Sequence, residues 1–156
     1  MASLVVDSSV AIKWFVPEPF AAEAAAILAA YQARTLTLFA PDLIYAELGN
    51  ILWKKQTLQG LAAADAARII GDVGNLGLAI TPSVELLSDA YRLAVAHRRT
   101  VYNAFYLALG VRENCAVVTA DERLVNAVGT ALPNVSWLGT YALPSTDIDS
   151  NRGPTR

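Results

Sequence analysis

Near its start the chain reads Ser3-Leu-Val-Val-Asp7, followed directly by Ser-Ser-Val-Ala-Ile-Lys-Trp14. The first run is short, apolar and partly β-branched, which predicts a strand buried on both faces. Asp7 or Ser8 then begins a helix, and Pro17 ends it. A buried strand that passes directly into a helix is the repeating unit of proteins with parallel sheets.

The rest of the chain repeats this alternation of short apolar runs and longer helical patterns. Further strands are predicted at residues 36–40, 78–80, 116–119 and 135–138. Helices are predicted at residues 18–33, 42–56, 61–76, 83–98, 103–114 and 121–130. This spacing predicts an α/β fold, a three-layer α/β/α sandwich in which helices cover both faces of a mainly parallel sheet of about five strands.

The length and composition describe one domain with a short tail. The 156 residues fit a single core, which we place at residues 1–143. Hydrophobic residues make up 54% of the chain, enough to support folding along most of its length. Residues 144–156 are polar and contain Pro and Gly, which predicts a disordered C-terminal tail. There is no run of about 18 apolar residues and no secretory signal, so we expect a cytoplasmic protein without a membrane span.

Several kinds of chemistry have little support in the composition. Cys115 is the only cysteine and His97 the only histidine, which argues against a disulfide, a His-rich zinc site and a His-based triad. The formal net charge of −2 counts mildly against a polyanionic partner. A bound divalent cation would reverse the local sign of the charge, so an acidic metal site remains compatible with a polyanion.

Two carboxylates follow predicted strands. Asp7 ends the first strand, and Asp121 comes after the strand at residues 116–119. Ligands of open α/β sheets bind beyond the carboxyl ends of the strands, so both side chains are expected to point into one crevice. The plain alternative is that each Asp only caps the helix that follows it. The repetition of the arrangement favours a functional pair.

Glu47 lies on the apolar face of the predicted helix at residues 42–56. It comes three positions after Ile44 and four before Ile51, which belong to that face. Burying a lone carboxylate is costly, and a metal ion or a basic partner would remove the cost. The alternative is a Glu at the edge of the apolar stripe with its carboxylate in water.

Carboxylate oxygens suit Mg2+ or Mn2+, which can activate water and neutralise charge at a phosphodiester. We therefore expect Asp7, Glu47 and Asp121 to form a divalent-metal site. The hydroxyls of Ser8, Ser9 and Thr119 would orient the carboxylates or their waters, with helix capping and turn bonding as the alternative role, above all for Ser8.

Four segments together resemble PIN domains, in particular the VapC-type toxins of bacterial VapBC toxin–antitoxin pairs. The segments are Val5–Phe15, Pro41–Asn50, Val101–Leu109 and Val117–Leu124. Their order and spacing hold over about residues 3–140, and each is weak alone. The resemblance implies a Mg2+- or Mn2+-dependent endoribonuclease in which Asp7, Glu47 and Asp121 match the family's acidic residues.

The resemblance also implies partners and supporting residues. The family commonly forms homodimers, takes RNA as substrate and is blocked by a cognate VapB-type antitoxin that inserts a segment into the active-site groove. Ser9 and Thr119 match the hydroxyl positions beside the family's site. The aromatic side chains Trp14 and Trp53 are compatible with such interfaces, or are ordinary core.

One position departs from the family pattern. The third segment normally reads Tyr-Asp-Ala, whereas this chain has Tyr102-Asn103-Ala104. Asn keeps a carbonyl acceptor but lacks the negative charge, so a site with Asn103 among its catalytic residues should hold a divalent ion less tightly. Asn103 is either a deliberate inactivating substitution or natural variation. Without the resemblance, Asn103 is interpreted as the N-cap of the helix at residues 103–114.

Three functions therefore remain open. The leading hypothesis is a ribonuclease toxin attenuated by Asn103, and the main alternative is a catalytically silent PIN-like module that binds RNA or a protein. A structure-specific DNA nuclease is the third, which the absence of an obvious DNA-clamping insertion disfavours. The basic residues that could contact phosphates, or simply pair on the surface, are Lys13, Lys54, Lys55, Arg98, Arg99 and Arg123.

Overall fold

The computed structural model of the chain describes residues 1–145, so nearly all of the tail predicted at residues 144–156 lies outside the described residues. One sheet has the strand order β3-β2-β1-β4-β5, and every neighbouring pair is parallel. The strands are β1 (Ala2–Val6), β2 (Leu36–Pro41), β3 (Ala79–Thr81), β4 (Ala116–Thr119) and β5 (Val135–Trp137). The predicted parallel sheet is confirmed.

The chain reverses its direction of travel across the sheet beside β1. It first moves outward from β1 to β2 and β3, then returns to place β4 on the other side of β1 and β5 beyond it. A reversal of this kind opens a crevice at the carboxyl ends of the two strands that flank it, here β1 and β4. The register pairs Val6 with Val118, so these two strands end side by side.

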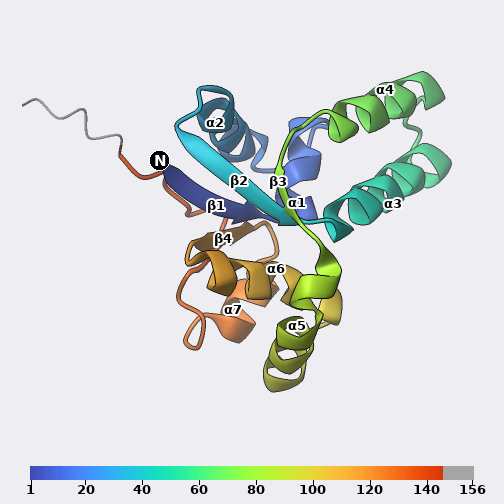
Figure 1. Ribbon diagram of the computed structural model, residues 1–156. Coiled ribbons are helices and arrows are strands. Elements are labelled where there is room, and N and C mark those ends of the chain that lie inside the picture. The colour runs from blue at the N-terminus through green and yellow to red at the C-terminus, as the bar shows by residue number, and fades with distance from the viewer. Residues whose placement is uncertain (146–156) are drawn as a thin grey trace, which may run out of the picture.

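Helices cover both faces of the sheet. The elements α1 to α4 lie on one side and α5 to α7 on the other, while α3 and α4 project together beyond the sheet (Figure 1). The helical elements are α1 (Ser8–Ala11), the 3-10 helix η1 (Ile12–Trp14), α2 (Ala21–Gln32), α3 (Leu43–Leu58), α4 (Ala63–Gly74), α5 (Ser83–His97), α6 (Val101–Glu113) and α7 (Glu122–Val128). Within residues 1–145, no helix is long and apolar enough to cross a membrane.

The core is densest where α6 lies between the sheet and α5. Every residue from Ala104 to Gly110 is buried, so α6 is enclosed all round rather than on one face. Gly110 allows this close packing, because a Cβ atom there would lie 2.2 Å from Cγ2 of Val117 in β4. The apolar face predicted for α3 is also confirmed by the buried side chains of Ile44, Leu48 and Leu52.

The starts of helices α2 and α6 differ from the prediction. Helix α6 begins at Val101, and its N-cap is Thr100, whose hydroxyl accepts a hydrogen bond from the Asn103 N–H at 3.2 Å. The interpretation of Asn103 as an N-cap is therefore wrong, since Asn103 lies within the first turn. The helix predicted at residues 18–33 begins only at Ala21, after a loop that contains Pro17 and Pro19.

Candidate active site at the carboxyl ends of β1 and β4

Asp7 is a buried carboxylate at the end of β1. Its Oδ1 atom accepts a hydrogen bond from the Ser9 hydroxyl at 2.5 Å and from the Val10 N–H at 3.2 Å, so it also caps α1. Only 7% of Asp7 is exposed, and this burial raises its pKa from 3.8 to about 6, although the hydrogen bonds from Ser9, Thr119 and Val10 oppose the rise. Within residues 1–145, no Lys or Arg forms an ion pair with Asp7.

Glu47 is the second carboxylate of the site. Helix α3 places it, half-buried, one turn beyond the buried Ile44, and its negative charge contributes to the raised pKa of Asp7. Burial raises the pKa of Glu47 itself, while hydrogen bonds from Tyr106 and Ser8 lower it. The hydroxyl of Tyr106 donates to Oε1 of Glu47 at 2.6 Å. The structure thus brings Asp7 and Glu47 into electrostatic contact.

Ser9 and Thr119 connect the ends of β1 and β4. The Ser9 hydroxyl accepts a hydrogen bond from the Ala120 N–H at 2.9 Å and lies 3.4 Å from the Thr119 hydroxyl. Thr119 is fully buried, and its hydroxyl accepts from the Asp121 N–H at 3.1 Å. These bonds fix the two strand ends relative to each other across the reversal point of the sheet.

Asp121 lies at this edge but makes a different set of bonds. Its side chain is exposed, and Oδ1 accepts from the Arg123 N–H at 3.0 Å and from the Leu124 N–H at 3.4 Å. Asp121 therefore caps α7 in this structure, which is the role that the simpler interpretation predicted. Asn103 is half-buried in the first turn of α6, three residues before Tyr106.

The donor atoms at this site suit a hard divalent cation, although the ligand set is small. Within the described residues, no group of three or more His, Cys, Asp or Glu side chains is arranged to hold a metal ion. Asp7 and Glu47 supply two carboxylates whose charges are penalised by burial, and the charge of Glu47 adds a smaller penalty at Asp7. Mg2+ commonly takes one or two protein carboxylates and keeps several waters, so this pair fits the ion.

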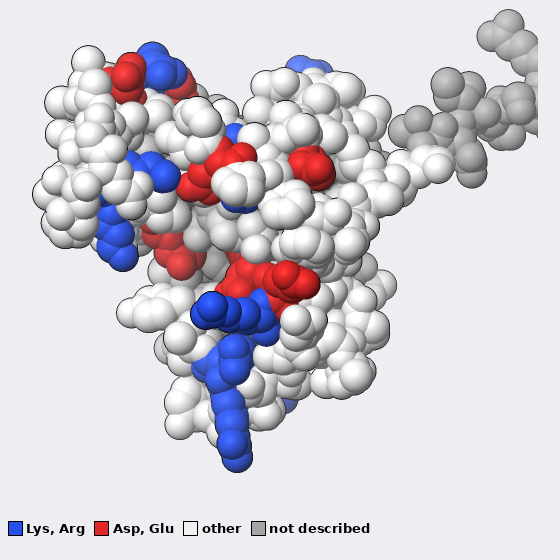
Figure 2. Space-filling model, turned by 180° about the vertical axis from the view of Figure 1, so that it is seen from behind, with Lys and Arg blue, Asp and Glu red and all other residues white. Residues whose placement is uncertain are grey.

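Two of the basic residues considered as phosphate contacts form ion pairs within the protein. The ammonium groups of Lys13 and Lys55 lie 3.0 Å and 3.1 Å from the two carboxylate oxygens of Glu18. Burial opposes ionisation of Glu18, but the hydrogen bonds and charges of these lysines lower its pKa overall. On the face seen in Figure 2, acidic side chains lie across the middle and a string of Lys and Arg side chains runs toward the bottom.

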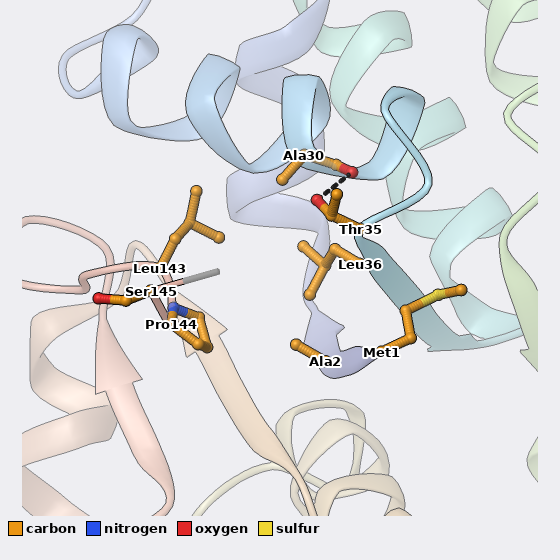
Figure 3. A pocket seen from close by; sticks show the side chains of 8 residues that line it. All are labelled: Met1, Ala2, Ala30, Thr35, Leu36, Leu143, Pro144 and Ser145. Carbon is orange, nitrogen blue, oxygen red and sulfur yellow. Dashed lines mark hydrogen bonds between the residues drawn. The ribbon is translucent and has the colours of Figure 1, made fainter. Parts of the chain in front are cut away.

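A cavity of about 380 Å3 lies far from this chemistry, at the amino ends of β1 and β2 (Figure 3). Its lining is apolar or hydroxyl-bearing, with a hydrogen bond from the Thr35 hydroxyl to the Ala30 carbonyl oxygen. The lining residues are Met1, Ala2, Ala30, Thr35, Leu36, Leu143, Pro144 and Ser145. None of these side chains is a carboxylate, histidine, cysteine or lysine, so the cavity offers no group for acid–base or metal chemistry.

The sequence did not identify Tyr106 as a partner of Glu47, whereas Ser8 was among the hydroxyls expected to orient the carboxylates. The signal was present, because Tyr106 places a hydroxyl in the middle of an apolar helical run where it needs a hydrogen-bond partner. The spacing along one helix could not show that the partner lies on α3.

The class of the protein is indicated by its parallel five-stranded sheet, covered by helices on both faces, with the buried carboxylate of Asp7 at the end of β1. The PIN domain family model matches residues 4–129, and the chain belongs to that family.

The relatives are more specific. Ribonuclease VapC3 of Pyrobaculum aerophilum is 32% identical over 124 residues, which is 78% of this chain and 91% of that protein. Ribonuclease VapC9 of Mycobacterium tuberculosis is 32% identical over 125 residues, 78% of this chain and 87% of that protein. The chain is thus similar to VapC ribonucleases over most of its length.

Two solved structures have the same fold. The crystal structure of PAE2754 from Pyrobaculum aerophilum has a TM-score of 0.65 at 22% identity and covers 89% of this chain and 92% of that one. The crystal structure of VapBC2 from Rickettsia felis, bound to a DNA fragment from its promoter, has a TM-score of 0.55 at 12% identity. The match covers 86% of this chain and 96% of that one. At these identities the likeness concerns the fold alone.

Proposed function

We propose that this chain is a divalent-metal-dependent endoribonuclease and the toxin of a type II, VapBC-like toxin–antitoxin pair. The observation that carries the proposal is the buried Asp7 beside the half-buried Glu47 at the reversal point of the sheet, without an ion-paired cation for Asp7 within residues 1–145. The ribonuclease names of relatives at 32% identity support RNA as the substrate.

Asp7 and Glu47 would hold Mg2+ or Mn2+, with Asp121 and the side-chain oxygen of Asn103 as further donors. Such an ion lowers the pKa of bound water and neutralises charge on the phosphodiester. Two hydroxyl groups of the protein would position the carboxylates: Ser9 orients Asp7 by its hydrogen bond, and Thr119 holds the backbone N–H of Asp121. In the reaction a water oxygen bonds to phosphorus and one P–O ester bond breaks.

Asn103 is proposed to attenuate this activity. A neutral amide at that position leaves the site one negative charge short, so the ion binds less tightly and activates water less well. The matched variant Asn103→Asp changes only the amide to a carboxylate, and we expect it to cleave RNA about tenfold faster or more.

The test compares wild type, Asn103→Asp and Asp7→Asn on tRNA, rRNA and mRNA in Mg2+, in Mn2+ and in EDTA. Cleavage that needs the metal, rises with Asn103→Asp and vanishes with Asp7→Asn supports the proposal. An Asn103→Asp protein that cuts none of these RNAs in either metal would sink it. DNA oligonucleotides of matched sequence separate a ribonuclease from a DNA nuclease.

A catalytically silent module that binds RNA or protein is the second candidate. The observations that favour it are the missing charge at Asn103 and the cap geometry of Asp121, which turns its carboxylate to α7. This candidate predicts RNA binding without cleavage even in the Asn103→Asp variant, measured by gel shift beside the cleavage assay.

We further propose a cytoplasmic protein that forms a homodimer and binds a VapB-type antitoxin. Four exposed apolar side chains, Val84, Leu87, Tyr91 and Val95, follow helical spacing along α5 and offer a surface for a protein partner. Analytical ultracentrifugation of the chain alone tests the dimer, and co-purification with the product of the neighbouring gene tests the antitoxin.

A further inference from the structure

The hydroxyl of Tyr106 is a polar group in the most enclosed helix of the protein. Tyr106 is 3% exposed, and its neighbours from Ala104 to Gly110 are all buried. A buried hydroxyl without a hydrogen-bond partner destabilises the folded protein, so the Tyr106 hydroxyl is expected to have a partner within the protein. Here it donates to Oε1 of Glu47, 59 residues earlier in the chain, at 2.6 Å.

The bond reaches across the sheet's carboxyl edge from one helical layer to the other. Tyr106 comes from α6 and Glu47 from α3, and these helices cover opposite faces of the sheet (Figure 1). Ser8 in α1 is 9% exposed, and its hydroxyl also lowers the pKa of Glu47. Hydroxyl groups from two other elements therefore hold one carboxylate, and a hydroxyl bonded to an ionised carboxylate is among the stronger hydrogen bonds in proteins.

We propose that Tyr106 is a positioning residue that fixes Oε1 of Glu47 by its hydroxyl and so leaves the other carboxylate oxygen oriented for the divalent cation. This inference rests on the proposed metal-dependent function and adds a residue to it. Tyr106 does not touch the ion in this scheme. It acts through Glu47 by fixing the carboxylate before the ion binds. The carboxylate then loses less rotational freedom on binding, so the ion is bound more tightly.

A purely structural role for Tyr106 makes different predictions. The aromatic ring fills core volume whether or not the hydroxyl is present, so Tyr106→Phe keeps the packing and removes only the bond to Glu47. The chain offers a matched control in Tyr31, whose hydroxyl donates to the carbonyl oxygens of Leu76 and Gly77 at 2.8 Å and 2.7 Å. Tyr31→Phe removes a tyrosine hydroxyl of similar kind that has no carboxylate partner.

The experiment is a titration with Mn2+ alone, followed by electron paramagnetic resonance of the free ion, on the full chain. Wild type, Tyr106→Phe, Glu47→Gln, the double variant and Tyr31→Phe are compared, and the set is repeated on the Asn103→Asp background, where tighter binding widens the measurable range. Circular dichroism melting of each protein confirms that it is folded. We expect Tyr106→Phe to weaken Mn2+ binding by about 10- to 100-fold, and Tyr31→Phe to lower the melting temperature without changing the Kd for Mn2+.

The Glu47→Gln background decides whether Tyr106 acts through Glu47. If it does, Tyr106→Phe changes the Kd little once Glu47 has lost its charge, so the effects of the two substitutions are not additive. Unchanged Mn2+ affinity in Tyr106→Phe, or an equal loss in Tyr31→Phe, or a full effect in the Glu47→Gln background, overturns the positioning role while the metal site stands. If neither wild type nor Asn103→Asp binds Mn2+, the proposed metal-dependent function fails, and the inference with it.

Discussion

Two aspartates at the carboxyl edge of the sheet have nearly the same hydrogen bonds and very different surroundings. Asp7 follows β1 and accepts from the Ser9 hydroxyl and the Val10 N–H. Asp42 follows β2 and accepts from the hydroxyl and the N–H of Ser83, the latter at 3.0 Å. Each Asp ties the start of a helix, but Asp7 is buried and Asp42 is exposed.

The difference shows what separates a structural link from a candidate site. Asp42 connects the ends of β2 and β3 in water, where its charge remains solvated. Asp7 lies at the reversal point between β1 and β4, beside Glu47, where burial penalises its charge. A position at a strand end is therefore enough to explain the hydrogen bonds of both aspartates. Burial beside a second carboxylate is specific to Asp7, and it destabilises the negative charge, which a bound cation would offset.

The largest expected effect is on catalysis. In the proposed function Asp7 is a charged ligand of the metal ion, so Asp7→Asn should lower the rate of RNA cleavage by about 100- to 1,000-fold, as when a group that stabilises the transition state is lost. Asp42→Asn removes the same charge from the neighbouring strand end and should leave the rate unchanged. Initial rates of cleavage in Mn2+ on the Asn103→Asp background measure both. Equal losses in the two variants would contradict the distinction.

The next effect is on stability and its pH dependence. The pKa of Asp7 is raised from 3.8 to about 6, so the folded protein binds this proton more tightly than the unfolded chain does. The stabilisation from protonated Asp7 is complete below about pH 4 and is lost as the pH rises through about 6, which lowers the free energy of unfolding by about 3 kcal/mol. Asp7→Asn lacks this loss, so it should be more stable than wild type at pH 7.

Urea denaturation in EDTA between pH 4 and pH 7.5 measures this pH dependence, with Asp42→Asn as the matched control that keeps the wild-type profile. Adding Mn2+ should reduce the advantage of Asp7→Asn, because the ion stabilises only a site that still carries the charge. A wild-type protein whose stability rises from pH 4 to pH 7 by the same amount as that of Asp7→Asn would contradict the buried-charge account.

The smallest effects compare the two serines. Ser9→Ala removes the donor to Asp7 and leaves the Ala120 N–H without its acceptor, so the free energy of unfolding should fall by about 1–3 kcal/mol. Ser83→Ala removes only the exposed hydrogen bond from the Ser83 hydroxyl to Asp42, because the Ser83 N–H still donates. It should lower the free energy of unfolding by less than about 0.5 kcal/mol. Urea melts at pH 7 measure both, and similar losses would show that the two links are equivalent.

Much of the fold follows from local patterns along the chain. Short apolar runs predicted all five strands to within one residue, because a strand buried on both faces leaves an uninterrupted apolar signal. The placement of Glu47 on the buried face of α3 followed from its spacing to Ile44. Both cases depend on residues within a few positions of each other, which is the range over which periodicity carries information.

Other features depend on contacts that no local pattern contains. The partner of Tyr106 lies 59 residues away on α3. The order of the strands is likewise decided by the whole chain, and it places the end of β4, with Thr119, beside the end of β1 at the candidate site.

The pairing of β1 with β4 also has a consequence for the timing of synthesis. Asp7 directly follows β1, whereas the strand whose end holds Ser9 in place begins only at Ala116, so β1 leaves the ribosome well before β4. A nascent chain can pair β1, β2 and β3 but cannot complete this end of the sheet until nearly the whole domain has emerged. Chains interrupted before β4 are therefore released without the strand that completes this end of the sheet.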